Sequence, residues 1–534
     1  MDLDSTRSRQ RILEAAVALL QEERSLAGQL VEDSARAASV PLSSAKLFFR
    51  NDEELILAIY LRLANDLQRL AAGLAPGKTG ERFRLLMLSK LNLAAPYREA
   101  FAGLFAKMLD PRTNIGVLSP QTELVRLRSR AAFARVVSGA TDAPDSSAAL
   151  IQSLYGAHLA LMLVWSQDHS PELRSTHAAL NLVCKLTALL LRFDWVPQTR
   201  GMLENLGAIF GPLVEPPTDT KTNRVARDIL NFLFRSRRLL GGSQNCPDAG
   251  KDGLCEQCLE PHQPLVRRFV GAGLPVHFVL PAFPAKSPNP EKVLGRLPDM
   301  AEELALEFLN GLCQKIKRIY PPGAKITICS DGLVFSDLVG VTDADVRVYG
   351  KQIEALIERT QLEFLETFHM QDLYDRAGSG EQMRDSLCRH YAEPIETVRE
   401  RLHSNDSQKS LFNGIQRFLF EDRVVLEKNK SRTRIRSECK ERTYEVVRRS
   451  DAWGRLLADC FPASLRLSIH PQPWHSEKIG ILLGESKDVW LTPWHAVALK
   501  EKGKFRFIKQ VEAEAAGATV VLKDGQPSYM EIPE

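Results

Sequence analysis

Residues 280–303, Leu-Pro-Ala-Phe-Pro-Ala-Lys-Ser-Pro-Asn-Pro-Glu-Lys-Val-Leu-Gly-Arg-Leu-Pro-Asp-Met-Ala-Glu-Glu, decide how the second half of the chain folds. They follow an apolar run, 276–280, that is typical of a buried strand. They lead into 300–319, where apolar residues recur at helical spacing. Five prolines stiffen the connection. Ligands of open α/β sheets bind beyond the carboxyl ends of strands, so a ligand site is expected at this loop.

The loop carries polar side chains that could bind a charged ligand. We expect Lys286, Ser287, Asn289 and Lys292 to project from the proline-stiffened frame. A surface loop with solvated lysines is the alternative interpretation.

Two further segments place polar residues at predicted strand ends. Asp331 directly follows a predicted strand at 325–329, where a carboxylate serves acid/base chemistry or caps the next helix. Alternation at 464–472 puts Arg466, Ser468 and His470 on one face of another strand.

These segments resemble signatures of the isocyanide (isonitrile) synthases, the pyoverdine/dityrosine biosynthesis group. The resembling motifs are Phe-Pro-Ala-Lys-Ser-Pro-Asn, Lys-Val-Leu-Gly, Leu-Pro-Asp-Met-Ala-Glu, Ser-Asp-Gly-x-Val-Phe-Ser-Asp, Arg-Leu-Ser-Ile-His-Pro-Gln and Thr-Pro-Trp-His. The likeness covers roughly residues 223–503. It implies an α/β Rossmann-like domain.

The resemblance also implies a reaction. These synthases convert an aromatic L-amino acid, tyrosine or tryptophan, to its α-isocyano acid. The added carbon comes from ribulose 5-phosphate by lyase-type carbon-carbon cleavage, and no cofactor is required. The implied pathway partner is an iron/2-oxoglutarate oxygenase.

Residue roles follow from that chemistry. His470 and His495 are the predicted acid/base pair, with Asp331 as their carboxylate partner. Lys286, Lys292 and Arg466 are predicted to bind the phosphate and the carboxylate, and Lys286 is alternatively a Schiff-base lysine. The remaining predicted substrate-binding residues are Ser287, Asn289, Ser468 and Asp337.

A cysteine-rich segment precedes the loop. Cys246, Cys255, Cys258 and His262 offer three thiolates and an imidazole, a ligand set that suits a structural zinc ion. Free or packed cysteines are the alternative, because the first gap is unusual for a zinc site.

The first half of the chain is helical in pattern. Helices at 11–20, 30–38 and beyond 40 resemble the helix-turn-helix of TetR-type repressors, with Ser39 where that family usually has glycine. The implied DNA-binding residues are Ser43, Ser44 and Lys46; a module that only packs is the alternative. Residues 57–210 resemble the helical effector and dimerisation half of those repressors, which implies a homodimer.

Composition fits these assignments. The 534 residues are 44% hydrophobic and 25% charged, which is typical of a globular protein of several domains. Nine cysteines do not form a disulfide framework, and the apolar run 159–165 is too short for a membrane span, so we expect a cytoplasmic protein.

A basic run at 423–449 contains ten Lys/Arg and four Glu. Its alternative interpretations are a solvated helix face, a site that binds an anion, and a surface that binds DNA.

The predicted fold is therefore multidomain: an all-α TetR-like half followed by an α/β synthase domain. The expected segments are 1–56 (helix-turn-helix), 57–210 (helical bundle), 211–223 (linker) and 224–534 (synthase). A transcriptional regulator whose C-terminal domain senses an amino acid or isonitrile without catalysis is the alternative function.

Overall fold

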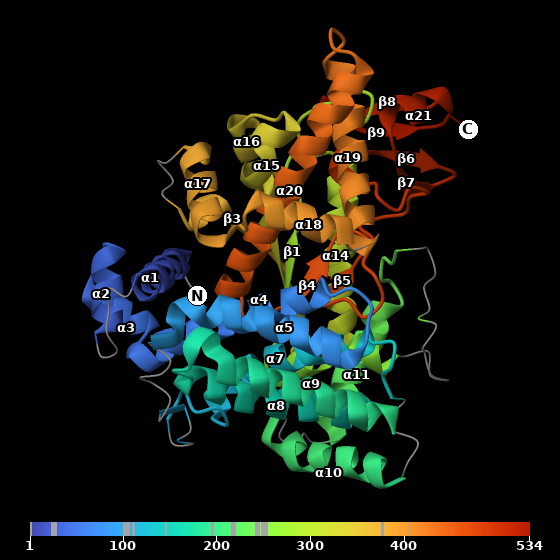
Figure 1. Cartoon of the computed structure of the whole chain (residues 1–534). Helices are drawn as coiled ribbons and strands as arrows, with labels where there is room; N and C mark the ends of the chain where they lie inside the picture. Colours follow the sequence, from blue (N-terminus) through green and yellow to red (C-terminus); the bar gives the residue numbers. More distant parts are fainter. Residues whose placement is uncertain are drawn as a thin grey trace. The chain divides into compact units, whose positions relative to one another are not determined.

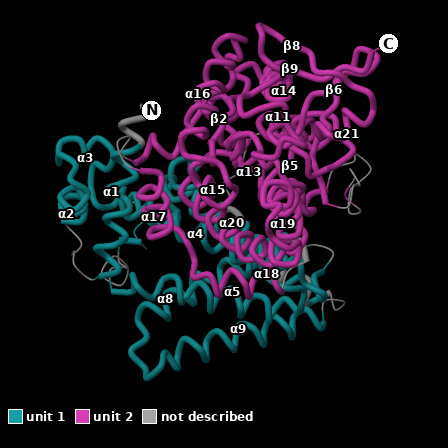
Figure 2. Tube along the Cα trace, turned by 90° about the horizontal axis from the view of Figure 1, so that it is seen from above, with its two compact units in different colours: residues 1–219, 458–462 teal, residues 220–457, 463–534 magenta. Residues whose placement is uncertain are grey.

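The computed structural model describes residues 3–22, 29–99, 107–108, 110, 113–144, 147–193, 197–214, 220–240, 246, 255–374, 379–404 and 406–533. The chain divides into two compact units, coloured separately in Figure 2. Unit 1 comprises residues 1–219 and 458–462, and unit 2 comprises 220–457 and 463–534. Within the predicted linker, 211–214 end one helix and 220–223 begin the next.

The regular secondary structure in the described part of unit 1 is helical. Helix α4 runs without a break through the predicted boundary between residues 56 and 57. The helices are α1 (Leu3–Gln21), α2 (Leu30–Ala37), α3 (Leu42–Phe48), α4 (Asp52–Ala72), α5 (Thr79–Ala94), α7 (Glu123–Ser138), α8 (Ser147–Gln167), α9 (Arg174–Arg192) and α10 (Pro197–Val214), with short 3-10 turns at Ala95–Tyr97, Pro120–Thr122 and Pro171–Leu173.

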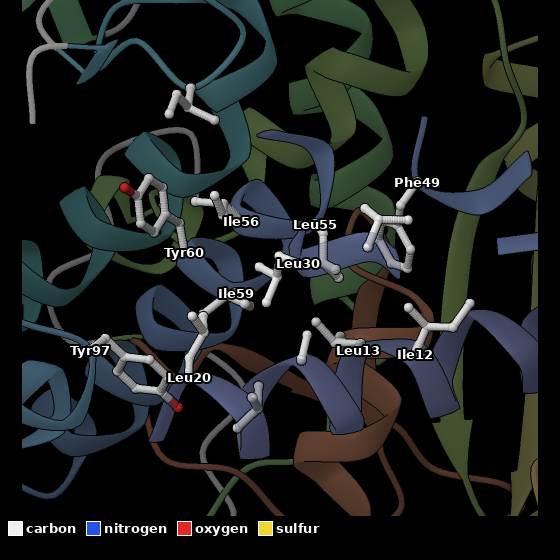
Figure 3. Close-up of a cluster of buried hydrophobic side chains, with 14 of the residues drawn as sticks. Ile12, Leu13, Leu20, Leu30, Phe49, Leu55, Ile56, Ile59, Tyr60 and Tyr97 are labelled. Carbon is white, nitrogen blue, oxygen red and sulfur yellow. The ribbon is translucent and has the colours of Figure 1, made fainter. Parts of the chain in front are cut away.

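Two apolar clusters form the core of unit 1. The first cluster contains side chains from α1, α2, α3 and α4. Figure 3 shows Leu13, Leu30 and Leu55 among them. The same cluster includes Tyr97 and Trp165. The first 60 residues therefore share a core with residues from the predicted bundle.

Ser39, in the turn between α2 and α3, has a backbone conformation that favours glycine. Ser39 has φ 53°, in the left-handed region that glycine occupies without strain. Ser34, on α2, is fully buried, and its Oγ has no hydrogen-bond partner in the described residues.

Helix α8 is the most apolar helix that unit 1 contributes. By length and composition alone it could cross a membrane, with a mean hydropathy of 1.5. Its side chains Leu154, Tyr155 and Trp165 are buried in the two clusters. Of its apolar window, 39% is buried in the structure.

Unit 2 is built on a five-stranded parallel sheet of order β3-β2-β1-β4-β5 (Figure 1). The strand order reverses direction between β1 and β4, which is where open α/β sheets form a ligand crevice. The strands are β1 (Val276–Pro281), β2 (Ala324–Ser330), β3 (Leu365–His369), β4 (Leu465–Ser468) and β5 (Lys478–Gly480).

Helices and a second sheet complete unit 2. A four-stranded sheet of order β7-β6-β9-β8 follows the parallel sheet in the chain. The helices are α11 (Thr220–Phe234), α12 (Glu256–Leu259), α13 (Gln263–Gly271), α14 (Met300–Ile319), α15 (Gly332–Val339), α16 (Asp343–Arg359), α17 (Gly380–Tyr391), α18 (Ile395–Ser404), α19 (Asp406–Leu426), α20 (Arg432–Cys460) and α21 (Gln510–Ala515), and the strands of the second sheet are β6 (Val497–Glu501), β7 (Lys504–Ile508), β8 (Thr519–Lys523) and β9 (Gln526–Glu531). Short 3-10 turns occupy Met370–Asp372 and Pro493–His495.

The predicted strand, loop and helix around residues 280–303 are confirmed. Strand β1 supplies the buried run, and α14 begins at Met300 because Asp299 and Glu302 form a capping box. Strand β4 is shorter than predicted, because the Ser468 side chain accepts a hydrogen bond from the His470 amide and turns the chain.

Candidate functional site

Lys286 lies inside the loop between β1 and α14. Its Nζ is 2.9 Å from Asp299 Oδ2 and 2.8 Å from Glu302 Oε2, and it donates to the Pro493 carbonyl at 3.2 Å. The side chain is 0% exposed. Lys286 therefore ties the loop to the start of α14 and to the turn Pro493–His495.

The charge of Lys286 opposes a Schiff-base role. Burial alone would lower the pKa of Lys286, but the carboxylates of Asp299 and Glu302 outweigh it and raise the pKa. An amine with a raised pKa stays protonated and is a poor nucleophile.

The other predicted loop residues are also held internally. Lys292 Nζ lies 3.0 Å from Glu421 Oε2 and 2.6 Å from Asp422 Oδ1, both on α19. Asn289 accepts from the Glu291 amide and donates to the Glu421 carbonyl. The Ser287 side chain accepts from the Asn289 amide, and its own amide donates to the Trp494 carbonyl.

The expectation that these four side chains project from the loop is wrong. Lys286, Ser287, Asn289 and Lys292 are 2%, 4%, 2% and 1% exposed. Each finds a charged or backbone partner in the loop or in a neighbouring segment. The loop is held in place by the polar residues that were expected to bind ligand.

Asp331 differs from them. It follows β2 and lies at the start of α15, but its side chain makes no capping hydrogen bond. Its Oδ1 is buried and has no hydrogen-bond partner among the described residues. Burial raises the pKa of Asp331 to about 7, so this carboxyl group can give or take a proton near neutral pH.

The end of β4 carries a second unpaired group. Ser468 Oγ accepts from the amide of His470 at 3.1 Å and from Nε2 of Gln472 at 3.0 Å, which fixes the turn. His470 Nδ1 is buried and lacks a hydrogen-bond partner in the described chain. Burial, with the charges of Arg238 and Lys478, lowers the pKa of His470 to about 3, so the ring is neutral.

His495 lies near His470. Its ring stacks on Phe418 at 5.0 Å between centroids, and Nδ1 is 3.0 Å from Thr492 Oγ1. Burial, followed by the charge of Lys292, lowers the pKa of His495 well below its ordinary value. Two neutral imidazoles therefore belong to the region at the carboxyl end of β4.

Arg466 and Asp337 have different surroundings. Arg466 donates to the Gly454 carbonyl at 2.8 Å, while its buried Nε has no hydrogen-bond partner in the described residues. Asp337 is 2.7 Å from Arg449 and 3.5 Å from Arg384, on α15 rather than at a strand end. Arg466 keeps donor capacity for an anion, whereas Asp337 joins α15 to α20 and α17.

Part of the basic run at 423–449 is ion-paired. Arg423, Lys430 and Arg434 all contact Glu438. Arg449 contacts Asp337 and Glu445. These pairs favour an interhelical and intrahelical role for the cations that make them.

Sequence reasoning missed Arg238. This residue is 4% exposed and donates to the carbonyls of Ile469, which precedes His470, and of Leu491, in the segment before His495. Glu421 and Asp422, the partners of Lys292, were also missed. No local motif identifies them, because their partners are far away in the sequence.

The cysteines come together, but with a different histidine. Cys246, Cys255 and Cys258 cluster with His475. His262 instead donates from Nε2 to the Ser476 carbonyl at 3.0 Å. The predicted fourth ligand is therefore replaced by one from the loop that follows β4.

On α3, Ser43 and Lys46 are exposed and Ser44 is half-buried. Lys46 lies 3.4 Å from Glu32 of α2. Leu47 is 81% exposed beside them.

Comparisons with known proteins match the second half of the chain. The family model described as pyoverdine/dityrosine biosynthesis protein matches residues 266–521. The L-tryptophan isonitrile synthase AmbI2 of Fischerella ambigua is 47% identical over 310 residues, 58% of this chain and 92% of the relative. The L-tyrosine isonitrile synthase of Pseudomonas aeruginosa is 44% identical over 318 residues, 59% of this chain and 95% of the relative.

A solved structure gives the same result. The crystal structure of the PvcA protein from Pseudomonas aeruginosa has a TM-score of 0.54 and 42% identity, and the match covers 57% of this chain and 99% of that one. The identities and the coverage of the relatives far exceed what a shared fold alone would give. This chain therefore belongs to the pyoverdine/dityrosine biosynthesis family, the family of the isonitrile synthases.

Proposed function

We propose that unit 2 converts an aromatic L-amino acid, tyrosine or tryptophan, to its α-isocyano acid, with ribulose 5-phosphate as carbon donor. The observation that carries this proposal is the buried, unpaired Oδ1 of Asp331 at the end of β2, in a chain 47% identical to an L-tryptophan isonitrile synthase. A buried carboxylate oxygen without a hydrogen-bond partner is costly to keep, which favours a chemical role.

The reaction assigns a task to each group. The substrate amine condenses with the C2 ketone of the sugar, and proton shifts, phosphate loss and carbon-carbon cleavage leave that carbon as the isocyanide. Asp331, with its pKa near 7, takes and returns the protons. The neutral rings of His470 and His495 hydrogen-bond the reacting groups. Arg466 binds the carboxylate or phosphate through its free donor, and Lys286 and Lys292 position the loop.

The test is product formation by the purified full chain. It is incubated with ribulose 5-phosphate and either tyrosine or tryptophan, and α-isocyano acid is followed by mass spectrometry. Asp331→Asn and His470→Asn should each lower kcat by about 10²–10⁴-fold. Asp345→Asn, a half-buried carboxylate on α16 paired with Arg296, is the matched control and should keep full activity.

Two outcomes of the product assay would contradict parts of this proposal. If the folded chain gives no product while a known synthase does under the same conditions, unit 2 is a sensor and not a catalyst. Activity that survives in Asp331→Asn would keep the synthase but reject this assignment of the proton-transfer groups.

For unit 1 we propose that α3 contacts DNA, in a homodimer. Exposed Ser43 and Lys46 on one short helix support it, since such donors reach phosphates and base edges. Footprinting at the promoter of this gene should show protection that Lys46→Ala weakens. Absence of protection by the wild-type chain would leave unit 1 as a packing module.

A further inference from the structure

Three cysteines and one histidine from two distant segments meet in unit 2. The Sγ atoms of Cys246, Cys255 and Cys258 and a ring nitrogen of His475 all lie within 4.8 Å of one another. His475 Nε2 is 3.5 Å from Sγ of Cys246 and 3.5 Å from Sγ of Cys255. The three thiols are buried, and none is in a disulfide.

These separations match the edges of a tetrahedral zinc site. Zinc binds thiolate sulfur at about 2.3 Å and imidazole nitrogen at about 2.1 Å, which puts sulfur and nitrogen about 3.6 Å apart in a tetrahedron. Three thiolates and an imidazole are also a ligand set that structural zinc sites use. We propose that Cys246, Cys255, Cys258 and His475 bind a structural zinc ion.

Neighbouring residues hold the backbone around His475. The φ of His475 is 60°, in the left-handed region. His262 donates to the carbonyl of the next residue, Ser476, and its ring lies edge-on to Phe234. His262 therefore supports the backbone beside His475 from outside the ligand set.

The surrounding charge also fits. A zinc ion with three thiolates carries a net negative charge, which a buried site must compensate. The Arg237 guanidinium lies between the rings of Phe234 and Trp474, at 4.6 and 4.7 Å from their centroids. A cavity beside the cluster is lined by Arg237, Cys258 and His475, so this cation is close to the thiolates.

The ion would have a positioning role in the site. It would join the cysteine segment to the loop after β4, which is also held by the bridge between Leu239 and Gln472. Gln472 in turn donates to Ser468 Oγ, which fixes the His470 turn. Zinc would thus stabilise the strand end that carries His470 without contacting substrate.

The test is the metal content of the full chain, purified without chelator or metal-affinity resin and measured by inductively coupled plasma mass spectrometry. We expect one zinc ion per chain. His475→Gln and Cys258→Ser should lose most of it. His262→Gln and Cys388→Ser, the latter a half-buried cysteine on α17, should keep it.

A second measurement does not depend on the folding of any variant. Cobalt added to the zinc-stripped wild-type chain should give the visible bands of tetrahedral cobalt and thiolate-to-metal charge transfer, and stoichiometric zinc should remove them. A wild-type chain that holds no zinc and gives no cobalt–thiolate spectrum overturns the proposal. Zinc retained in His475→Gln but lost in His262→Gln overturns the ligand set.

Discussion

The loop after β1 and the ends of β2 and β4 all hold buried polar atoms, but they use these atoms differently. In the loop, Lys286 and Lys292 each contact two carboxylates. At the strand ends, Asp331 Oδ1 and His470 Nδ1 have no hydrogen-bond partner in the described chain. Burial alone therefore does not identify a catalytic group; burial without a partner is the better indication.

The largest expected effect separates the two regions by stability. Lys286→Met removes the ammonium but leaves Asp299 and Glu302 buried, so the free energy of unfolding should fall by about 3–5 kcal/mol. Urea denaturation measures this. The control Lys315→Met lies at an exposed position of α14, the helix that carries Glu302. It should change the free energy of unfolding by no more than about 0.5 kcal/mol. If the Lys286→Met chain kept its stability and lost only activity, Lys286 would instead have the predicted substrate-binding role.

A smaller effect concerns pH. A carboxyl group whose pKa is higher in the folded state binds more protons there than in the unfolded state, so stability falls as pH rises between the two pKa values. For Asp331 that window runs from about 4, the ordinary value, to about 7. Asp331→Asn should flatten the fall in unfolding free energy measured by urea denaturation across this window. Equal slopes in both chains would show that Asp331 is solvated or paired.

The smallest expected effect concerns a buried polar atom without a partner in unit 1, where we expect no catalytic role. Ser34 of α2 is 0% exposed, and its hydroxyl has no partner in the described residues. Ser34→Ala should raise the free energy of unfolding by about 1 kcal/mol, because a buried unpaired hydroxyl is removed. Thermal unfolding and the product assay measure the outcome. Lost activity in this variant would contradict the expectation that the Ser34 hydroxyl takes no part in the chemistry.

The elements around the site could be predicted because each depends on local pattern. The apolar spacing of Met300–Ile319 and the short runs at β1 and β2 give the helix and strands that the structure contains. Strands β2 and β4 both pair in parallel with β1, so their carboxyl ends lie at one edge of the sheet. This pairing brings Asp331 and His470 to that edge.

The partners of polar residues could not be predicted in this way. Nothing near Lys292 indicates Glu421 or Asp422, which are supplied by α19. Likewise, spacing favours His262 as the neighbour of Cys258, yet the fold brings His475 there from the loop after β4. These choices depend on which distant segments pack together, which one sequence does not state.

The strand order has a consequence for how the protein acquires its active form. Central strand β1 pairs with β4, and the side chains of His277 and Ser464, 187 residues apart, hydrogen-bond across this pair at 2.6 Å. Closing so long a loop is slow, whereas β1 and β2 are separated only by the loop 282–299, helix α14 and a short turn. We expect pulse-labelled hydrogen exchange during refolding to protect β1 and β2 before β4. On the ribosome, catalytic competence would then wait until almost the whole polypeptide has emerged.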